Sequence, residues 1–233
     1  MIKRIIFIAV MSAFVAVPAM ADLIGTANVQ HTGVSPRIDM TIWGRGYQGL
    51  GVQTGVYHQA ITNSTVGGLA DWGFCIEMQY STGSNPVYNV LTLDQAPIDQ
   101  GPGGNPMGVT KADYIRELWA IVDPSPTMTA VQAAAMQAAI WEIVYEDSGL
   151  PWNVSTYNED DTMNSFKVAG DGAVIAQANT WLDQLNGMGP LANLVALSND
   201  LYQDYVVQVP VPAAVLLGML GLSVAGLKLR KFA

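Results

Sequence analysis

The stretch Ala-Ala-Ala-Met-Gln-Ala-Ala-Ile-Trp, residues 133–141, is apolar at every position except Gln137. It predicts a helix that begins after Thr129, a residue type that caps helix N-termini, and runs to about Asp147. Because apolar residues surround the whole axis instead of forming one stripe, we expect this helix to be buried. A buried carboxamide needs a partner for its donor and its acceptor, and leaving either unmet costs about 1–3 kcal/mol. The partner of Gln137 is therefore a feature that the fold must supply.

Two more helices are predicted around this one. Residues 111–122 carry apolar side chains at three- and four-residue spacing, and Pro124 ends that segment. Residues 171–186 form the other helix, whose inward-facing residues are expected to be Val174, Ala178, Trp181 and Leu185.

Segments typical of strands lie on both sides of the helices. Residues 39–70 and 73–78 precede them and residues 191–209 follow, all with alternating or β-branched sequence. Residues 81–108 are rich in Pro, Gly, Asn and Asp, and we interpret them as a loop without a core element. The order predicts an α+β fold, with a β-rich barrel or sandwich part and an inserted helical subdomain that carries the Gln137 helix.

The N-terminus is typical of a secretory signal peptide. Lys3 and Arg4 precede an apolar run over residues 5–17, and Ala19-Met20-Ala21 offers small residues for cleavage after Ala21. Residues 1–21 are therefore predicted to direct export, and the alternative is an N-terminal membrane anchor. The segment 22–208 is long enough for one domain with a full core.

The C-terminal segment, residues 209–233, has three parts. Pro210 and Pro212 precede an apolar run over residues 213–227, and Lys228, Arg230 and Lys231 follow. Counted from Val209, the apolar stretch is just long enough to span a bilayer with its basic end on the cytoplasmic side. This pattern resembles the PEP-CTERM sorting signal of two-membrane bacteria that produce exopolysaccharide, with Val211 in place of the family's glutamate. The resemblance implies an exosortase as partner and a cell-surface or matrix location; the alternative is a permanent single-span anchor.

The charge of the chain narrows the possible partners. All 19 acidic residues lie between Asp22 and Asp204, whereas only five basic residues do, so this segment carries a net charge of −14. Such an excess excludes nucleic acid and anionic lipid as expected partners. The acidic run 158–161 lacks the alternation and glycine of a calcium loop, so we interpret it as solvated loop, and no metal site or cofactor is predicted.

Cys75 is the only cysteine of the chain, so no disulfide within the chain is possible. Exported cysteines normally occur in pairs, and a single one needs an explanation. Alternation along residues 73–78 places Phe74, Ile76 and Met78 on one face, and Cys75 and Glu77 on the other.

Two short motifs resemble the thioester domains of bacterial surface proteins. Phe74-Cys75-Ile76 matches the aromatic-Cys-aliphatic strand of that family, and Gln137-Ala138-Ala139-Ile140-Trp141 matches its Gln-x-Ala-Ile-Trp helix, with Met136 where the family often has Thr. The resemblance implies a Cys75–Gln137 thioester that attaches the protein covalently to an amine-bearing ligand: a protein lysine, a polyamine or an amino sugar. Glu77 or Glu142 is the expected acid–base helper, and the residues expected to shield the bond are Trp72, Phe74 and Trp141.

Two other interpretations remain open from the sequence. Cys75 is the nucleophile of a peptidase or acyltransferase if His31 or His58 serves as its base. Alternatively it is a small buried apolar residue of a passive matrix protein. Thioester chemistry of the implied kind is single-turnover, so on the main interpretation the protein is not an enzyme.

Overall fold

The computed structural model of the chain describes residues 23–44, 47–78, 82, 85–97, 106–146, 151–157 and 166–209. The predicted signal peptide with Ala21, the sorting tail with Pro210 and Pro212, and the acidic run 158–161 lie outside these residues. None of the helices within the described ranges is long and apolar enough to cross a bilayer.

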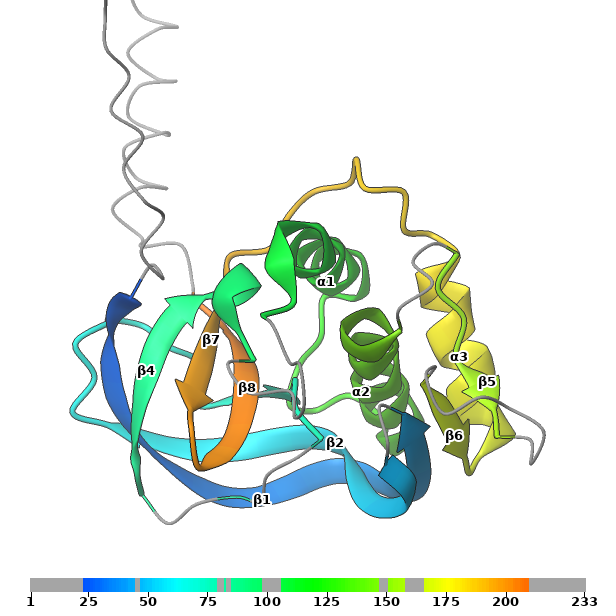
Figure 1. Ribbon diagram of the computed structural model, residues 1–233, viewed down its shortest axis with the longest axis horizontal. Helices are drawn as coiled ribbons and strands as arrows, with labels where there is room; N and C mark the ends of the chain where they lie inside the picture. Colours follow the sequence, from blue (N-terminus) through cyan, green and yellow to red (C-terminus); the bar gives the residue numbers. More distant parts are fainter. Residues whose placement is uncertain are drawn as a thin grey trace, which may run out of the picture.

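Six of the described strands are bonded in a closed ring (Figure 1). Their bounds are β1 (Leu23–Gly44), β2 (Tyr47–Thr62), β3 (Trp72–Cys75), β4 (Val87–Thr92), β7 (Leu194–Asn199) and β8 (Tyr202–Gln208). The pairing runs β1–β2–β3–β8–β7–β4 and returns from β4 to β1, and every one of these pairs is antiparallel. Two short strands, β6 (Lys167–Ala169) and β5 (Ser155–Thr156), extend the sheet beyond β1 and pair with each other in parallel.

The strand β1 belongs to two parts of the fold because of its length. Leu23–Asn28 pair with β4 and so close the ring, whereas Thr41–Trp43 pair with β6. Along its other edge β1 pairs with β2 from Asn28 to Gly44. Figure 1 shows β1 and β2 leaving the ring together as a twisted ribbon that passes beneath the helices. The ribbon thereby joins the ring to the helical part.

Three α-helices of the described residues lie between β4 and β7 in the chain: α1 (Gly108–Val122), α2 (Ala130–Tyr145) and α3 (Gly172–Leu182). The central helix α2 packs against α3, β1 and β2, and all its residues from 133 to 145 are buried. A capping box begins it, in which the Thr129 side chain accepts from Gln132 N–H and Gln132 Oε1 accepts from Thr129 N–H. The α+β prediction is confirmed: the fold is a mostly antiparallel eight-stranded sheet with ring-like bonding, plus three helices.

One element lies where the sequence predicted only loop. Val87–Thr92 form β4, between β1 and β7, with Tyr88, Val90 and Leu91 buried. The prediction of a loop over residues 81–108 was wrong, because the sequence on both sides of this six-residue strand is rich in Pro and Gly and hid its strand pattern. The short 3₁₀ helix η1 (Leu93–Gln95) follows the strand.

Other boundaries also differ from those predicted. β1 begins at Leu23 instead of near residue 39, and α3 ends at Leu182 instead of residue 186. The predicted strand 191–209 is a hairpin of β7 and β8, which is consistent with its alternation.

Candidate functional site

Cys75 is the last residue of β3, at a point where this strand loses one of its two neighbours. On one side Cys75 pairs with Tyr205 of β8. On the other side the pairing of β2 with β3 includes only Tyr57–Gly73 and His58–Trp72. The same register would place Gly55 opposite Cys75, but the ladder stops before that pair. An open position therefore lies beside the Cys75 backbone, in the interior of the protein.

The carboxamide of Gln137 fills this open position. Cys75 N–H donates to Gln137 Oε1 over 2.9 Å, and Gln137 Nε2 donates to the Cys75 carbonyl over 2.7 Å. A β2 residue at this position would have made the same two bonds, because hydrogen-bonded pairs recur at every second residue of an antiparallel ladder. Both residues are 0 % exposed, so each bond satisfies a group that would otherwise cost about 1–3 kcal/mol.

The chain turns directly after Cys75. The Cys75 S–H donates to the Glu77 carbonyl over 2.6 Å, and Glu77 N–H donates to the sulfur over 3.3 Å. The predicted strand to Met78 is therefore too long: β3 ends at Cys75, so the predicted alternation of faces does not extend to residues 76–78. This turn is the bend that brings the Glu77 backbone to the Cys75 sulfur.

Strand β8 holds Glu77 in place. Asp204 N–H donates to Glu77 Oε2 over 3.1 Å, and Gln203 Nε2 donates to the Glu77 carbonyl over 3.2 Å. The Asp204 carboxylate itself accepts from the Ser198 hydroxyl over 2.6 Å and from Asn199 N–H over 2.8 Å. A buried carboxyl group is thus fixed within the turn that holds the sulfur.

The environment of the sulfur disfavours its charged form. Burial raises the pKa of the Cys75 thiol well above its usual value, and the Glu77 and Asp204 carboxylates raise it further. A hydrogen bond with the Glu77 backbone acts in the opposite direction, as does the Trp141 indole, which favours the charged sulfur although its N–H makes no hydrogen bond of ordinary geometry to the thiol. At neutral pH the sulfur is therefore a thiol, and a base has to remove its proton before it can act as a nucleophile.

Aromatic rings cover the site. Trp72, which is partly exposed, stacks on Trp119 with ring centroids 5.7 Å apart, and Phe74 meets both rings edge-on. Trp141 is buried against Phe166, with centroids 6.2 Å apart. Trp72, Phe74 and Trp141, the residues predicted to shield the bond, thus all make aromatic contacts. Cys75 and Gln137 are themselves 0 % exposed, so their contact lies out of reach of solvent.

Comparisons with protein-family models, curated proteins and solved structures give no match. The function of the chain must be argued from its own geometry. Within the described residues no group of three or more His, Cys, Asp or Glu side chains is arranged to hold a metal ion.

Glu142 lies elsewhere in the core. It follows Gln137 by five residues on α2, so the two side chains leave different faces of the helix. Its Oε1 accepts from Asn153 N–H over 2.9 Å, and its Oε2 has no hydrogen-bond partner in the described structure. Burial raises the pKa of Glu142 to about 8 from an ordinary value of 4.5. Of the two predicted helpers, Glu77 is the one that the structure brings to the Cys75 turn.

The buried Glu142 predicts a pH-dependent stability. Between about pH 4.5 and 8 the folded protein keeps a proton that the unfolded chain has released, so stability is highest below this window and falls as the pH rises through it. The loss is on the order of 3–5 kcal/mol. Glu142→Gln should remove most of this difference when urea unfolding is compared at about pH 5 and about pH 8. An unchanged pH dependence in the variant would contradict an ionisation of Glu142 in this window.

The two histidines are engaged away from the sulfur. His58 Nε2 lies 2.6 Å from the Ser35 carbonyl, and the His31 ring packs on Tyr57 with centroids 5.6 Å apart. This hydrogen bond and this ring contact do not include Cys75, so in the described structure neither histidine is seen in the contact with the thiol that the peptidase or acyltransferase interpretation requires.

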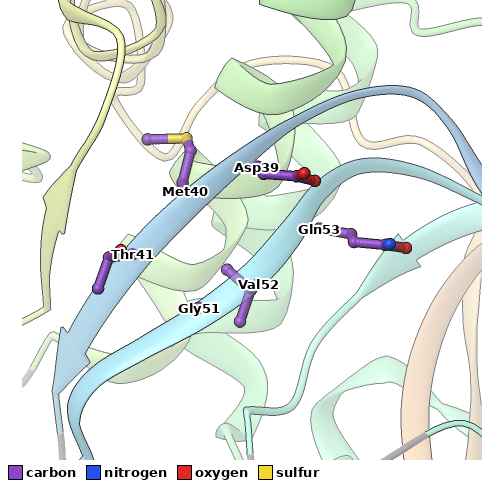
Figure 2. A pocket seen from close by; sticks show the side chains of 6 residues that line it. All are labelled: Asp39, Met40, Thr41, Gly51, Val52 and Gln53. Carbon is purple, nitrogen blue, oxygen red and sulfur yellow. The ribbon is translucent and has the colours of Figure 1, made fainter.

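A surface hollow of about 390 Å³ lies on the β1–β2 ribbon, and Cys75 and Gln137 are not among its lining residues. Figure 2 shows Asp39 and Gln53, paired across the two strands, pointing the same way, while Met40 points toward the helices. The bare backbone of Gly51 forms part of the lining, and a side chain added there would meet no atom within 4 Å. The hollow is an open feature of the ribbon surface and lies apart from the buried pair.

Two residues that organise the site, Tyr145 and Asp204, were not predicted from the sequence. Tyr145 accepts from Met78 N–H over 2.8 Å and donates to the Ile76 carbonyl over 3.4 Å, while Asp204 holds Glu77. The position of Tyr145 could have been predicted, because Gln137, Trp141 and Tyr145 follow each other at four-residue spacing on one face of α2. The role of Asp204 could not, since it depends on the pairing of β8 with β3.

Proposed function

We propose that Cys75 and Gln137 form an internal thioester, and that this bond serves once as an electrophile through which the exported protein attaches to an amine-bearing ligand. The observation that carries the proposal is the reciprocal pair of hydrogen bonds between the Gln137 carboxamide and the Cys75 backbone, in a dry interior. A fold that holds the two reacting groups this rigidly can supply an effective concentration of about 10⁵ M or more.

The strand geometry gives the sulfur a path to the amide carbon. Both backbone bonds of Cys75 point toward Gln137, so the Cys75 Hα points toward β8. The staggered rotamer in which Sγ lies opposite Hα therefore directs the sulfur to the strand edge that Gln137 occupies. A rotation about one side-chain bond of Cys75 exchanges the contact with Glu77 for contact with the carboxamide.

The residues present supply the groups that the reaction needs. The Glu77 carboxylate takes the thiol proton, the sulfur attacks Gln137 Cδ, and the carbonyl electron pair moves to Oε1. Cys75 N–H already donates to that oxygen over 2.9 Å and stabilises the oxyanion. Collapse expels the nitrogen, which leaves as ammonia with the proton from Glu77, so thiol and amide become thioester and ammonia.

The stored bond then reacts with an amine of the ligand. The amine nitrogen bonds to the Gln137 carbonyl carbon, the carbon–sulfur bond breaks, and Cys75 recovers its proton as a free thiol. A lysine with an ordinary pKa near 10.4 is mostly protonated at neutral pH, so the ligand surface has to desolvate it. Protein lysines, polyamines and amino sugars all fit this chemistry. It needs no cofactor, and it consumes the protein, so we do not class the protein as an enzyme.

Export and sorting complete the proposal. A signal peptide over residues 1–21 and an exosortase acting on the C-terminal segment would place the domain at the cell surface or in the extracellular matrix. A net charge of −14 between Asp22 and Asp204 favours cationic amine ligands over nucleic acid.

Release of the thiol by an amine tests the proposal. Protein denatured without amine should show no free thiol, and protein first incubated with methylamine should show one per molecule, because aminolysis frees Cys75. Gln137→Ala should show the thiol under both conditions. A fully reactive thiol in wild-type protein that has never met an amine would contradict the thioester.

A passive structural role is the second candidate, and a specific observation favours it. Both polar groups of the Gln137 side chain are already satisfied by the Cys75 backbone, which is sufficient reason for a buried glutamine at this position. On this account Cys75 is a buried apolar residue, and the methylamine experiment finds the same thiol with and without the amine.

A further inference from the structure

Three buried tryptophans have an indole N–H without a hydrogen-bond partner in the described structure: Trp119, Trp141 and Trp152. An orphaned buried donor costs about 1–3 kcal/mol and calls for an explanation. Trp119 makes a T-shaped ring contact with Phe74, and Trp152 makes one with Tyr114. The position of Trp141 differs from both.

Trp141 lies between two residues that contact the Cys75 turn. Gln137, one helical turn earlier, binds the Cys75 backbone, and Tyr145, one turn later, binds Ile76 and Met78. The four-residue spacing puts all three side chains on one face of α2, so the Trp141 ring faces the same segment. This indole lowers the pKa of the Cys75 thiol and so favours the thiolate, although its N–H makes no bond of ordinary geometry to the neutral thiol.

We propose that the Trp141 indole N–H is a catalytic hydrogen-bond donor to the Cys75 sulfur, unpaired in the resting thiol and engaged when negative charge develops there. The assignment rests on the proposed thioester and gives Trp141 a role beyond shielding. A donor that is fixed in a dry site and aimed at developing charge acts without reorganisation during the reaction.

The donor acts when the carbon–sulfur bond breaks. The amine nitrogen bonds to the Gln137 carbonyl carbon, and the bonding pair of the carbon–sulfur bond passes to the sulfur. Trp141 N–H donates to this thiolate, and the proton lost by the attacking nitrogen then reaches the sulfur. The products are the Gln137 amide and the Cys75 thiol, and the indole keeps its own proton throughout.

The test is the rate of methylamine aminolysis in Trp141→Phe, with Trp119→Phe as the matched control. Both variants lose the same atoms from a buried ring with an orphaned N–H, and Trp119 packs on Phe74, directly beside Cys75. A hydrogen bond to a charged group contributes enough that Trp141→Phe should react about 10- to 100-fold more slowly, with Trp119→Phe within about 3-fold of wild type. Mass spectrometry follows the adduct over time.

The outcomes separate this assignment from the thioester itself. If wild-type protein takes up no methylamine, the thioester fails and the role of Trp141 with it. If wild type reacts and Trp141→Phe keeps pace with Trp119→Phe, only the assignment is overturned. Should Trp141→Phe not fold, benzothienylalanine introduced at residue 141 removes the N–H while keeping the bicyclic shape. The same slowing is expected, and a wild-type rate would overturn the assignment.

Discussion

The folded protein should weigh one ammonia less than its amino-acid sequence requires. Thioester formation between Cys75 and Gln137 expels the amide nitrogen and removes no other atom, so intact-mass spectrometry measures the bond directly. The effect is all-or-none per molecule, because the two side chains lie in one buried site with no competing thiol in the chain. Incubation with methylamine should then add one methylamine to the lighter species.

Two variants make this measurement specific. Cys75→Ala and Gln137→Ala each remove one reacting group, and both should have their full calculated mass and take up no methylamine. Full mass in freshly folded wild-type protein, without an adduct after incubation, would refute the thioester. A mass loss that persists in Cys75→Ala would show that the ammonia leaves from another residue.

Replacing Gln137 by leucine should destabilise the fold strongly even where no thioester can form. The comparison is made in a Cys75→Ala background, in which the residue at position 75 keeps its backbone N–H and carbonyl. Leucine cannot bond to either group, and both would be left unsatisfied beside the end of β3. The expected loss is about 3–5 kcal/mol in the free energy of unfolding, measured with urea.

Gln184→Leu is the matched control for this loss. In the described structure the Gln184 side chain makes one hydrogen bond, to the Thr180 carbonyl over 2.8 Å, on an exposed surface. The same chemical change there should alter stability by no more than about 0.5 kcal/mol. Equal losses at the two positions would mean that the Gln137 carboxamide does not complete the edge of β3.

The sequence was informative about this fold wherever local pattern and burial agree. The Gln137 helix was predictable because apolar residues surround its axis and Thr129 offers a cap, and both features are found. The strand β4 was not, because residues 87–92 are recognised as a strand only once β1 and β7 lie on either side of them. Its pairing partners are about 60 and 100 residues away in the chain, and no local rule reports them.

The candidate site could also be predicted only in part from the sequence. Cys75 and Gln137 were predicted as a pair from a resemblance, and the structure brings them into hydrogen-bonding contact. The Glu77 backbone reaches the sulfur only because the chain turns after Cys75, a turn held by Gln203 and Asp204 of β8. Alternation, which treats the strand as continuing, could not foresee it. Such long-range supports are the part of a site that sequence patterns leave out.

The paired hydrogen bonds at the end of β3 also bear on whether capture can be undone. The Gln137 carboxamide accepts a hydrogen bond from Cys75 N–H and donates one to the carbonyl of the same residue. For the second bond it uses the amide hydrogen that is cis to Oε1. After aminolysis the nitrogen carries the ligand, and in a trans amide the ligand takes the place of that hydrogen. The modified side chain then cannot form the same pair of hydrogen bonds with Cys75. Attachment would therefore be irreversible, because the alignment from which the thioester formed is lost once the ligand is attached.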